Sequence, residues 1–342
     1  MSHIETLPEG PIAIIGDIHG ELEALDALLS ELDTRFPACH LVFLGDLADR
    51  GPDSPGVIAR VRERMERGAQ CVLGNHELSV IRGEDKGYNR WFFTEKGPWV
   101  EKTTGRVIPM VTVKDPEREA VEAFFRGLPL ALERDDLRIV HACWNAPAIS
   151  AVKARESKSI LEIFDEGPTH EVPEPEDLTR YNGGQFDEST RDFKWEREEL
   201  RQQNENAIAV LTAGLERPAE TVKGDKIVWS GGKWRPLLRD RWWDNYAENV
   251  PVVIGHYSRK WDVVARKADE KSELMFPGES PGAPRGLRSN VYAIDYAVGQ
   301  RFLERANGST GSFTGRLAAL LWDVEETPCL LFDDGETVPA VP

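Results

Sequence analysis

The sequence predicts an α/β fold, and two observations lead to this prediction. First, four short apolar runs each end in glycine followed by a residue type that binds metals: IAIIG-Asp17, LVFLG-Asp46, CVLG-Asn75 and VVIG-His256. Second, helical patterns separate the first three runs, which is the order expected of a parallel sheet. Ligand crevices in such sheets lie outside the carboxyl ends of the strands, so the four polar residues are expected at one edge.

Hydrophobic spacing predicts the helices between these strands. Over residues 21–36, leucines and a phenylalanine recur at three- and four-residue steps, as in a helix that packs one face on a sheet. A second helix is expected over residues 54–67. Residues 11–75 are therefore predicted to form a β-α-β-α-β unit with parallel pairing.

The middle of the chain is less regular. Residues 78–118 mix aromatic residues with charges and glycines, which indicates an irregular lobe near the mouth of the site. A helix over residues 116–127 and strands at LALE (130–133) and LRIVHA (137–142) are expected next.

Residues 150–235 are highly charged and are predicted to be an insertion or cap, with an ordinary surface elaboration as the alternative. Within them, PTHEVPEPED (168–177) is typical of a solvated loop. Residues 188–213 are typical of a helical stretch.

Four later apolar segments predict a second sheet: residues 251–254, 291–295, 317–323 and 329–333. The length alone would allow two domains. We nevertheless expect residues 1–342 to form a single domain, because ligands from Asp17 to His256 must converge on one site.

The composition excludes some classes of partner. The formal net charge of −17 repels nucleic acid phosphates and anionic membranes, so neither is expected as a partner. We find no apolar run long enough to span a bilayer and no signal-peptide pattern, which predicts a cytoplasmic protein. The four cysteines show no C-x-x-C spacing, so disulfides are not expected.

Residue types at the strand ends predict metal binding. Asp17 and His19 stand two residues apart, so both side chains can leave one face of an extended backbone. Asp46 has two oxygens and can hold two cations about 3.5–4 Å apart. Caps and turns are the ordinary alternative for such residues. Donors of nitrogen and oxygen without thiolate favour Mn²⁺, Fe, Zn²⁺ or similar ions.

Five segments together resemble the calcineurin-like metallophosphoesterases: Gly16-Asp17-Ile18-His19-Gly20, Gly45-Asp46-Leu47-Ala48-Asp49-Arg50-Gly51, Gly74-Asn75-His76-Glu77, Val140-His141-Ala142 and Gly255-His256-Tyr257. The sequence Asp-Arg-Gly-Pro-Asp-Ser (49–54) resembles the branch of phosphoprotein phosphatases and symmetrical diadenosine-tetraphosphate hydrolases. The resemblance implies a four-layer α/β/β/α sandwich with an inserted cap-like segment.

The resemblance also implies two divalent metal ions, with Mn²⁺ favoured and Fe, Zn²⁺, Co²⁺ or Ni²⁺ as alternatives. The first metal would take Asp17, His19 and Asp46. The second would take Asp46, Asn75, His141 and His256. Some relatives carry another histidine where this chain has Ser258, and the phosphoprotein phosphatase branch also lacks it.

Catalytic roles follow from the same resemblance. His76 would protonate the leaving oxygen, because imidazole has a pKa near the working pH. Asp49 would orient His76 and stabilise its charge. Arg50 would grip phosphate oxygens bidentately, and Asn75 is also expected to bind substrate.

Further polar residues are assigned with less support from the pattern. A second phosphate-binding arginine is expected among Arg239, Arg241 and Arg259, and we select Arg241, which precedes two tryptophans. Asp295 is expected either to support the site or to form a turn. His3 is expected in a frayed terminus and is assigned no role.

The predicted function is a binuclear metal-dependent phosphoesterase that hydrolyses a phosphomonoester or phosphoanhydride by direct attack of a metal-bridging hydroxide. The expected substrate is a phosphorylated small molecule, a nucleoside polyphosphate or a phosphoprotein. The alternatives are a symmetrical bis(5'-nucleosyl)-tetraphosphatase, a protein serine/threonine phosphatase and a catalytically silent metal-binding regulatory platform. Nucleic-acid end repair fits the acidic charge poorly.

Overall fold

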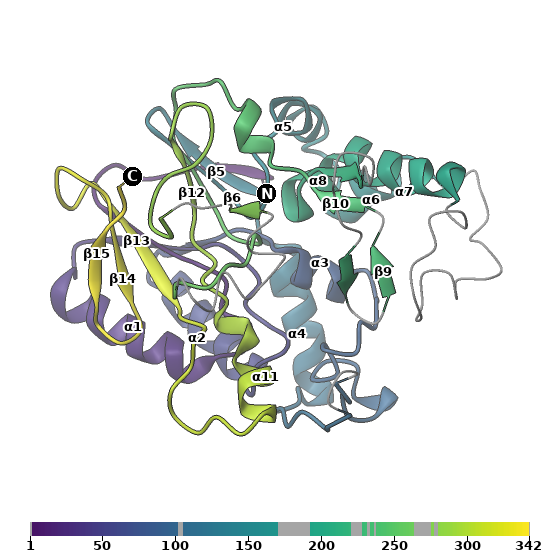
Figure 1. Ribbon diagram of the computed structural model, residues 1–342, viewed down its shortest axis with the longest axis horizontal. Helices are drawn as coiled ribbons and strands as arrows, with labels where there is room; N and C mark the ends of the chain where they lie inside the picture. Colours follow the sequence, from purple (N-terminus) through teal and green to yellow (C-terminus); the bar gives the residue numbers. More distant parts are fainter. Residues whose placement is uncertain are drawn as a thin grey trace.

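Two β-sheets lie at the centre of the molecule, with helices around them (Figure 1). The computed structural model describes residues 2–101, 105–169, 192–219, 228–230, 233–235, 237–262, 275–276 and 280–341. The first sheet has the strand order β15-β14-β13-β2-β3-β4, and the second has the order β1-β5-β6-β11-β12.

The first sheet contains the predicted β-α-β-α-β unit. Strand β2 pairs in parallel with β3, and β3 pairs in parallel with β4, which confirms the expectation for residues 11–75. The remaining strands of this sheet pair antiparallel, starting with β13 against β2. The strands are β2 (Ile12–Ile15), β3 (His40–Phe43), β4 (Gln70–Cys71), β13 (Ala318–Trp322), β14 (Cys329–Phe332) and β15 (Thr337–Pro339).

The second sheet consists of β1 (Ile4–Thr6), β5 (Ala131–Arg134), β6 (Leu137–Val140), β11 (Val252–Ile254) and β12 (Val291–Ala293). The expectation that residues 317–323 and 329–333 belong to it is wrong, because β13 and β14 extend the first sheet instead. Without β13, the apolar strand β2 would be an exposed edge with unpaired backbone groups.

Helices cover the outer faces of the sheets. The helices predicted over residues 21–36, 54–67 and 116–127 are confirmed, and residues 188–213 contain two helices. The α-helices within the described residues are α1 (Leu22–Arg35), α2 (Ser54–Glu66), α3 (Asn75–Ile81), α4 (Asp115–Arg126), α5 (Ala146–Lys153), α6 (Ile160–Asp165), α7 (Phe193–Glu205), α8 (Ala207–Ala213) and α11 (Arg301–Ala306). The same parts of the chain contain the 3₁₀ helices η1 (Thr94–Lys96), η5 (Trp242–Asn245) and η6 (Val298–Gln300).

Alternating side chains divide the interior into layers. Ile12 and Ile14 of β2 pack with Ile139 of β6 between the two sheets. Ala13 and Ile15 point the other way and belong to the cluster that includes the α1 leucines. This alternation confirms the four-layer α/β/β/α sandwich.

The irregular lobe is also confirmed, since the described residues between α3 and α4 hold only η1 and a bridge between Val100 and Val107. Helices α5 to α8 and two small sheets lie largely within residues 150–235, whose role as an insertion or cap stays a prediction. The small sheets pair β7 (Glu216–Pro218) with β10 (Leu237–Arg239), and β8 (Val228–Ser230) with β9 (Lys233–Arg235). Most of the segment 168–177, predicted to be a solvated loop, lies outside the described residues.

All four cysteines are free, as the sequence predicts. Among the described residues, no helix combines the length and the apolar character needed to cross a bilayer.

Candidate metal centre

The six predicted metal ligands meet where strands of both sheets end. Asp17 follows β2, Asp46 follows β3 and Asn75 begins α3, while His141 and His256 follow β6 and β11. Side-chain carboxylates, imidazoles and one amide therefore gather at the carboxyl edge of both sheets. Within the described parts of the chain, two groups have ligand atoms close enough to hold a metal ion: His19, Asp46 and His76, and Asp46, His141 and His256.

Asp46 is common to both groups and presents a different oxygen to each. Its Oδ2 lies 3.6 Å from Nε2 of His19, and its Oδ1 lies 3.4 Å from Nε2 of His141. Asp17 adds a second carboxylate on the first side, with Oδ2 3.9 Å from Nε2 of His19. Asn75 adds an amide on the second side, with Oδ1 2.8 Å from Nδ1 of His256 and 3.2 Å from Nε2 of His141. The geometry thus divides the six residues into two sets that share Asp46.

Backbone carbonyls fix the orientation of two of the imidazoles. Nδ1 of His19 donates to the carbonyl of Ala48 at 3.1 Å, and Nδ1 of His141 donates to the carbonyl of Leu44 at 2.6 Å. Because Nδ1 of each ring is engaged with the backbone, Nε2 faces the carboxylates. Such carbonyl partners commonly hold the ring of a metal-binding histidine.

Backbone strain concentrates at this edge. Five of the eight described non-glycine residues with positive φ are site residues: His19, Asp46, Asp49, Arg50 and His256, with φ between 47° and 77°. The left-handed conformation is costly for these residue types and persists where the surrounding structure enforces it. This strain supports the edge as a candidate functional site independently of any motif.

Burial and neighbouring charges shift the pKa values of the centre in opposite directions. Burial raises the pKa of Asp17, and Asp295 adds to this shift. Burial also opposes ionisation of Asp46, but His141 and His76 outweigh it and hold the pKa of Asp46 well below its usual range. For His141, burial favours the neutral ring, yet Asp46 outweighs burial and raises the pKa to about 10.

The other two histidines of the centre are shifted the opposite way. Burial lowers the pKa of His19, and Arg50 lowers it further. Burial and Arg239 lower the pKa of His256 in the same way. Neutral imidazoles beside an ionised Asp46 are the protonation states that bind cations.

His76, Asp49 and Arg50 form a second cluster beside the ligands. Nδ1 of His76 lies 2.6 Å from Oδ2 of the fully buried Asp49, whose other oxygen accepts from the indole of Trp91. Nε2 of His76 faces the centre, 3.7 Å from Oδ2 of Asp46 and 3.0 Å from the Arg50 guanidinium. The Tyr88 ring packs against His76 in a tilted arrangement, with the ring centres 4.8 Å apart, so the irregular lobe lies beside the site as expected.

The three candidate arginines occupy different environments. Arg241 forms a salt bridge with Asp244 at 2.6 Å, which directs its guanidinium to a neighbour on η5. Arg259 is buried and donates to the carbonyl of Ala293. Arg239 donates to the carbonyl of His256 at 2.9 Å, and its positive charge contributes to the lowered pKa of the His256 ring. Arg239 is therefore placed beside the centre, and Arg241 is turned toward η5.

Two residues near the centre had little support from the sequence pattern. Glu77 is fully buried beside Asp46, and burial together with Asp46 raises its pKa to about 7. Its position three residues after Gly74 is the signal for a helix-capping glutamate. Asp295 is also buried and accepts from the backbone N–H of Ala297 at 2.8 Å. Its negative charge helps to raise the pKa of Asp17.

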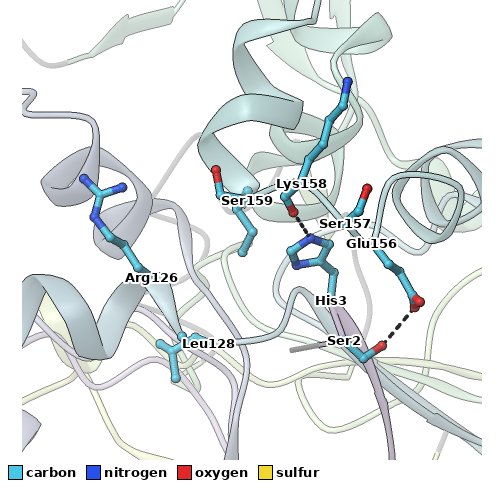
Figure 2. A pocket seen from close by; sticks show the side chains of 10 residues that line it. Ser2, His3, Arg126, Leu128, Glu156, Ser157, Lys158 and Ser159 are labelled. Carbon is cyan, nitrogen blue, oxygen red and sulfur yellow. Dashed lines mark hydrogen bonds between the residues drawn. The ribbon is translucent and has the colours of Figure 1, made fainter.

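A pocket of about 290 Å³ lies elsewhere, between the N-terminal residues, the end of α4 and the segment before α6. Figure 2 shows His3 reaching the carbonyl of Lys158, at 2.7 Å, and Ser2 reaching Glu156. His3 is buried, so the expectation of a frayed terminus is wrong there: β1 pairs with β5 and holds this end of the chain in the second sheet. The lining residues include none of the six candidate ligands.

Comparison with known proteins identifies the family. The family model described as "Calcineurin-like phosphoesterase" matches residues 10–259, which include all six candidate ligands. The chain belongs to this family. Calcineurin-like phosphoesterases hydrolyse phosphate esters at a dinuclear divalent metal centre, and the grouping of the ligands around Asp46 agrees with that.

Several relatives are symmetrical bis(5'-nucleosyl)-tetraphosphatases. The symmetrical bis(5'-nucleosyl)-tetraphosphatase of Janthinobacterium sp. (strain Marseille) is 32% identical over 152 residues, which cover 43% of this chain and 50% of the relative. That of Pectobacterium carotovorum subsp. carotovorum (strain PC1) is 28% identical over 204 residues, 51% of this chain and 67% of the relative. The match thus spans about half the length of the Janthinobacterium enzyme.

Other similar proteins are protein phosphatases. Serine/threonine-protein phosphatase 1 of Salmonella typhimurium is 34% identical over 91 residues, 27% of this chain and 41% of the relative. Among solved structures, the cold-active protein-tyrosine phosphatase of a Shewanella species is 13% identical with a TM-score of 0.48, covering 99% of this chain and 82% of that one. At this score the structural likeness has no bearing on function.

Proposed function

We propose that this chain is a binuclear metal-dependent phosphoesterase. The observation that carries the proposal is the buried Asp46, whose two oxygens face two separate sets of nitrogen and oxygen donors. A carboxylate in this position suits the two-metal chemistry of phosphoryl transfer, in which cations lie about 3.5–4 Å apart.

The donor set fits divalent transition metals. We assign Asp17, His19 and Asp46 to the first ion, and Asp46, Asn75, His141 and His256 to the second. Imidazole, carboxylate and amide donors without thiolate suit Mn²⁺, Fe, Zn²⁺, Co²⁺ or Ni²⁺, and we propose Mn²⁺ as the first choice. Nδ1 of His256 faces Oδ1 of the proposed ligand Asn75, so Nδ1 is the atom assigned to the metal. Nε2 of His256 is buried and has no hydrogen-bond partner among the described residues.

The remaining residues of the centre bind substrate and move a proton. When bound, the two cations supply positive charge to the phosphate and acidify the attacking water. His76 protonates the departing oxygen from Nε2, because Asp49 accepts from Nδ1 and stabilises the charged ring. Arg50 and Asn75 hold the phosphate from the first-sheet side.

For the second phosphate arginine we propose Arg239 in place of Arg241. Its guanidinium is anchored to the carbonyl of the proposed ligand His256 and packs over the ring of Tyr257, 5.5 Å from the ring centre. Arg241 is instead paired with Asp244. Arg50, which follows β3, and Arg239, which ends β10 in one of the small sheets, would then grip the phosphate together.

We propose a nucleoside polyphosphate as the substrate class. The longest matches quoted above are to symmetrical bis(5'-nucleosyl)-tetraphosphatases, whereas the serine/threonine phosphatase match is shorter. A phosphoprotein is the second candidate, supported by that shorter match.

The test measures Mn²⁺-dependent hydrolysis of three substrates in parallel. Diadenosine tetraphosphate is followed by the formation of ADP, because symmetrical cleavage yields two ADP and no free phosphate. A phosphoserine peptide and p-nitrophenyl phosphate are followed by the release of phosphate. We expect the wild type to hydrolyse p-nitrophenyl phosphate and diadenosine tetraphosphate, with a preference for the dinucleotide. The Asp46→Asn variant is expected to lose this turnover. A preference for the peptide would make a phosphoprotein the proposed substrate and would leave the proposed phosphoesterase reaction unchanged. Binding of two Mn²⁺ without turnover of any substrate would favour the silent regulatory platform instead.

A further inference from the structure

The Glu77 carboxylate lies at the junction of two segments that carry proposed ligands. Glu77 belongs to α3 and is fully buried. Its Oε2 accepts from the backbone N–H of Asp46 at 2.8 Å and from that of Gly74 at 3.1 Å, and its Oε1 accepts from the N–H of Leu47 at 2.9 Å. One side chain thus links the turn after β3 with the turn after β4.

These two turns approach too closely for any other side chain to lie between them. A Cβ atom on Gly45 would lie 2.5 Å from the nitrogen of Gly74, and a Cβ on Gly74 would lie 2.4 Å from the nitrogen of Asp46. Gly45 also has a φ of 83°, which favours glycine. The buried N–H groups here need an internal acceptor, because a buried donor without a partner is costly.

The bonds from Glu77 bracket the residue that the centre shares. Asp46 has a φ of 47°, in the left-handed region that is unfavourable for a residue with a side chain. Glu77 holds the N–H groups on both sides of the Asp46 Cα, and Oδ1 of Asp46 accepts from the N–H of His76 at 3.0 Å. The direction of the Asp46 side chain, between His19 and His141, depends on these bonds.

Helix capping explains only part of this arrangement. A glutamate at the third helical position commonly accepts the N–H at the helix start, as Glu77 does for Gly74. The bonds to Asp46 and Leu47 cross to a different strand end and contribute nothing to the cap. We infer that Glu77 is a positioning residue that fixes the Asp46 carboxylate between the two metal positions; this inference rests on the proposed function.

Two substitutions separate position from charge. Glu77→Gln keeps the shape but brings an NH₂ group against a backbone N–H, so one of the acceptors is lost. Glu77→Asp keeps the charge but is one methylene shorter and does not span both turns. If Glu77 acts by position, both variants bind Mn²⁺ about 10–100-fold more weakly, the usual effect of losing a partner that orients a ligand. If it acts by charge alone, Glu77→Asp binds Mn²⁺ as the wild type does.

Glu162→Gln is a matched control. Glu162 occupies the same position in α6, where its Oε2 accepts from the N–H of Ser159 at 2.7 Å, and α6 carries none of the proposed ligands. This variant tests the effect of losing a capping glutamate by itself. We expect it to bind Mn²⁺ with wild-type affinity.

The experiment is isothermal titration of Mn²⁺ into the full-length metal-free wild type and the three variants, with thermal unfolding of each metal-free form. The inference is overturned if folded Glu77→Gln or Glu77→Asp binds Mn²⁺ with wild-type affinity. If the wild type itself fails to bind two ions, the proposed function has failed instead. If neither Glu77 variant folds, hydrogen exchange of the wild type decides: the Asp46 and Leu47 amides must be as protected as those within β3, and rapid exchange contradicts the inference.

Discussion

The two sheets contribute to the candidate metal centre in different ways. The first sheet supplies the oxygen donors Asp17, Asp46 and Asn75 from consecutive parallel strands, together with the proposed acid. The second supplies one histidine from each of two strands, and these are anchored on the first sheet: Nδ1 of His141 donates to Leu44, and the N–H of His256 donates to Asp17 at 3.1 Å. The first metal position is therefore built within one sheet, whereas the second depends on how the two sheets pack.

Replacing the shared carboxylate gives the largest expected effect, because it removes a ligand from both halves. Asp46→Asn leaves one neutral oxygen where two charged oxygens faced separate donor sets. The two cations supply several kcal/mol of transition-state stabilisation, so we expect turnover to fall on the order of 10³-fold or more. Steady-state kinetics and metal analysis check this. If Asp46→Asn retains two ions and high activity, Asp46 is not the ligand that the two metal positions share.

His76 belongs to the first-sheet half but binds no metal in our assignment. His76→Ala is expected to lower kcat by about 10²–10⁴-fold on an alkyl phosphate, because general acid catalysis contributes this much. The loss on p-nitrophenyl phosphate should be smaller, since that leaving group needs little protonation. Two Mn²⁺ ions should remain bound. An equal loss on both esters would contradict the role of His76 as the acid. The loss of a bound ion would instead make His76 a metal ligand of the first sheet.

A smaller effect is expected at the two arginines that we propose to bind phosphate, which lie in different parts of the molecule. Arg50 follows β3, whereas Arg239 ends β10 and is anchored to His256. A hydrogen bond to a charged group contributes about 1.5–3 kcal/mol, so Arg239→Ala should raise KM by roughly ten- to hundredfold. Arg241→Ala is the control, and wild-type KM is expected because Arg241 pairs with Asp244. A raised KM in Arg241→Ala together with a wild-type KM in Arg239→Ala would instead identify Arg241 as the residue that binds phosphate.

The contrast between the two sheets also explains which parts of the fold could be predicted from the sequence. The β-α-β-α-β unit and the ligands on its strand ends lie in contiguous motifs, where glycine, carboxylate and hydrophobic period all agree. Sheet membership of β13 was mispredicted because an apolar strand pattern does not specify its neighbour. Arg239 and Glu77 contact the backbone of residues distant in sequence or on another strand end, and residue type alone does not encode such contacts.

The smallest expected effect concerns the helices that cover the first sheet. Asp33 of α1 accepts two hydrogen bonds from Arg64 of α2, both at 2.7 Å, and these bonds lower the pKa of Asp33 below its ordinary value of 3.8. A carboxyl with a lowered pKa in the folded state adds stability above pH 3.8, and this stability is lost as the pH falls through the folded-state pKa. The Asp33 side chain is 54% exposed, so screening limits the contribution to about 1 kcal/mol or less. Asp33→Asn should therefore lower the Tm slightly at pH 7, with a difference that shrinks toward pH 3 in thermal unfolding followed by circular dichroism. A Tm difference that stays constant over this range would mean that the pair holds α1 and α2 through packing and hydrogen-bond geometry, and not through the charge of Asp33.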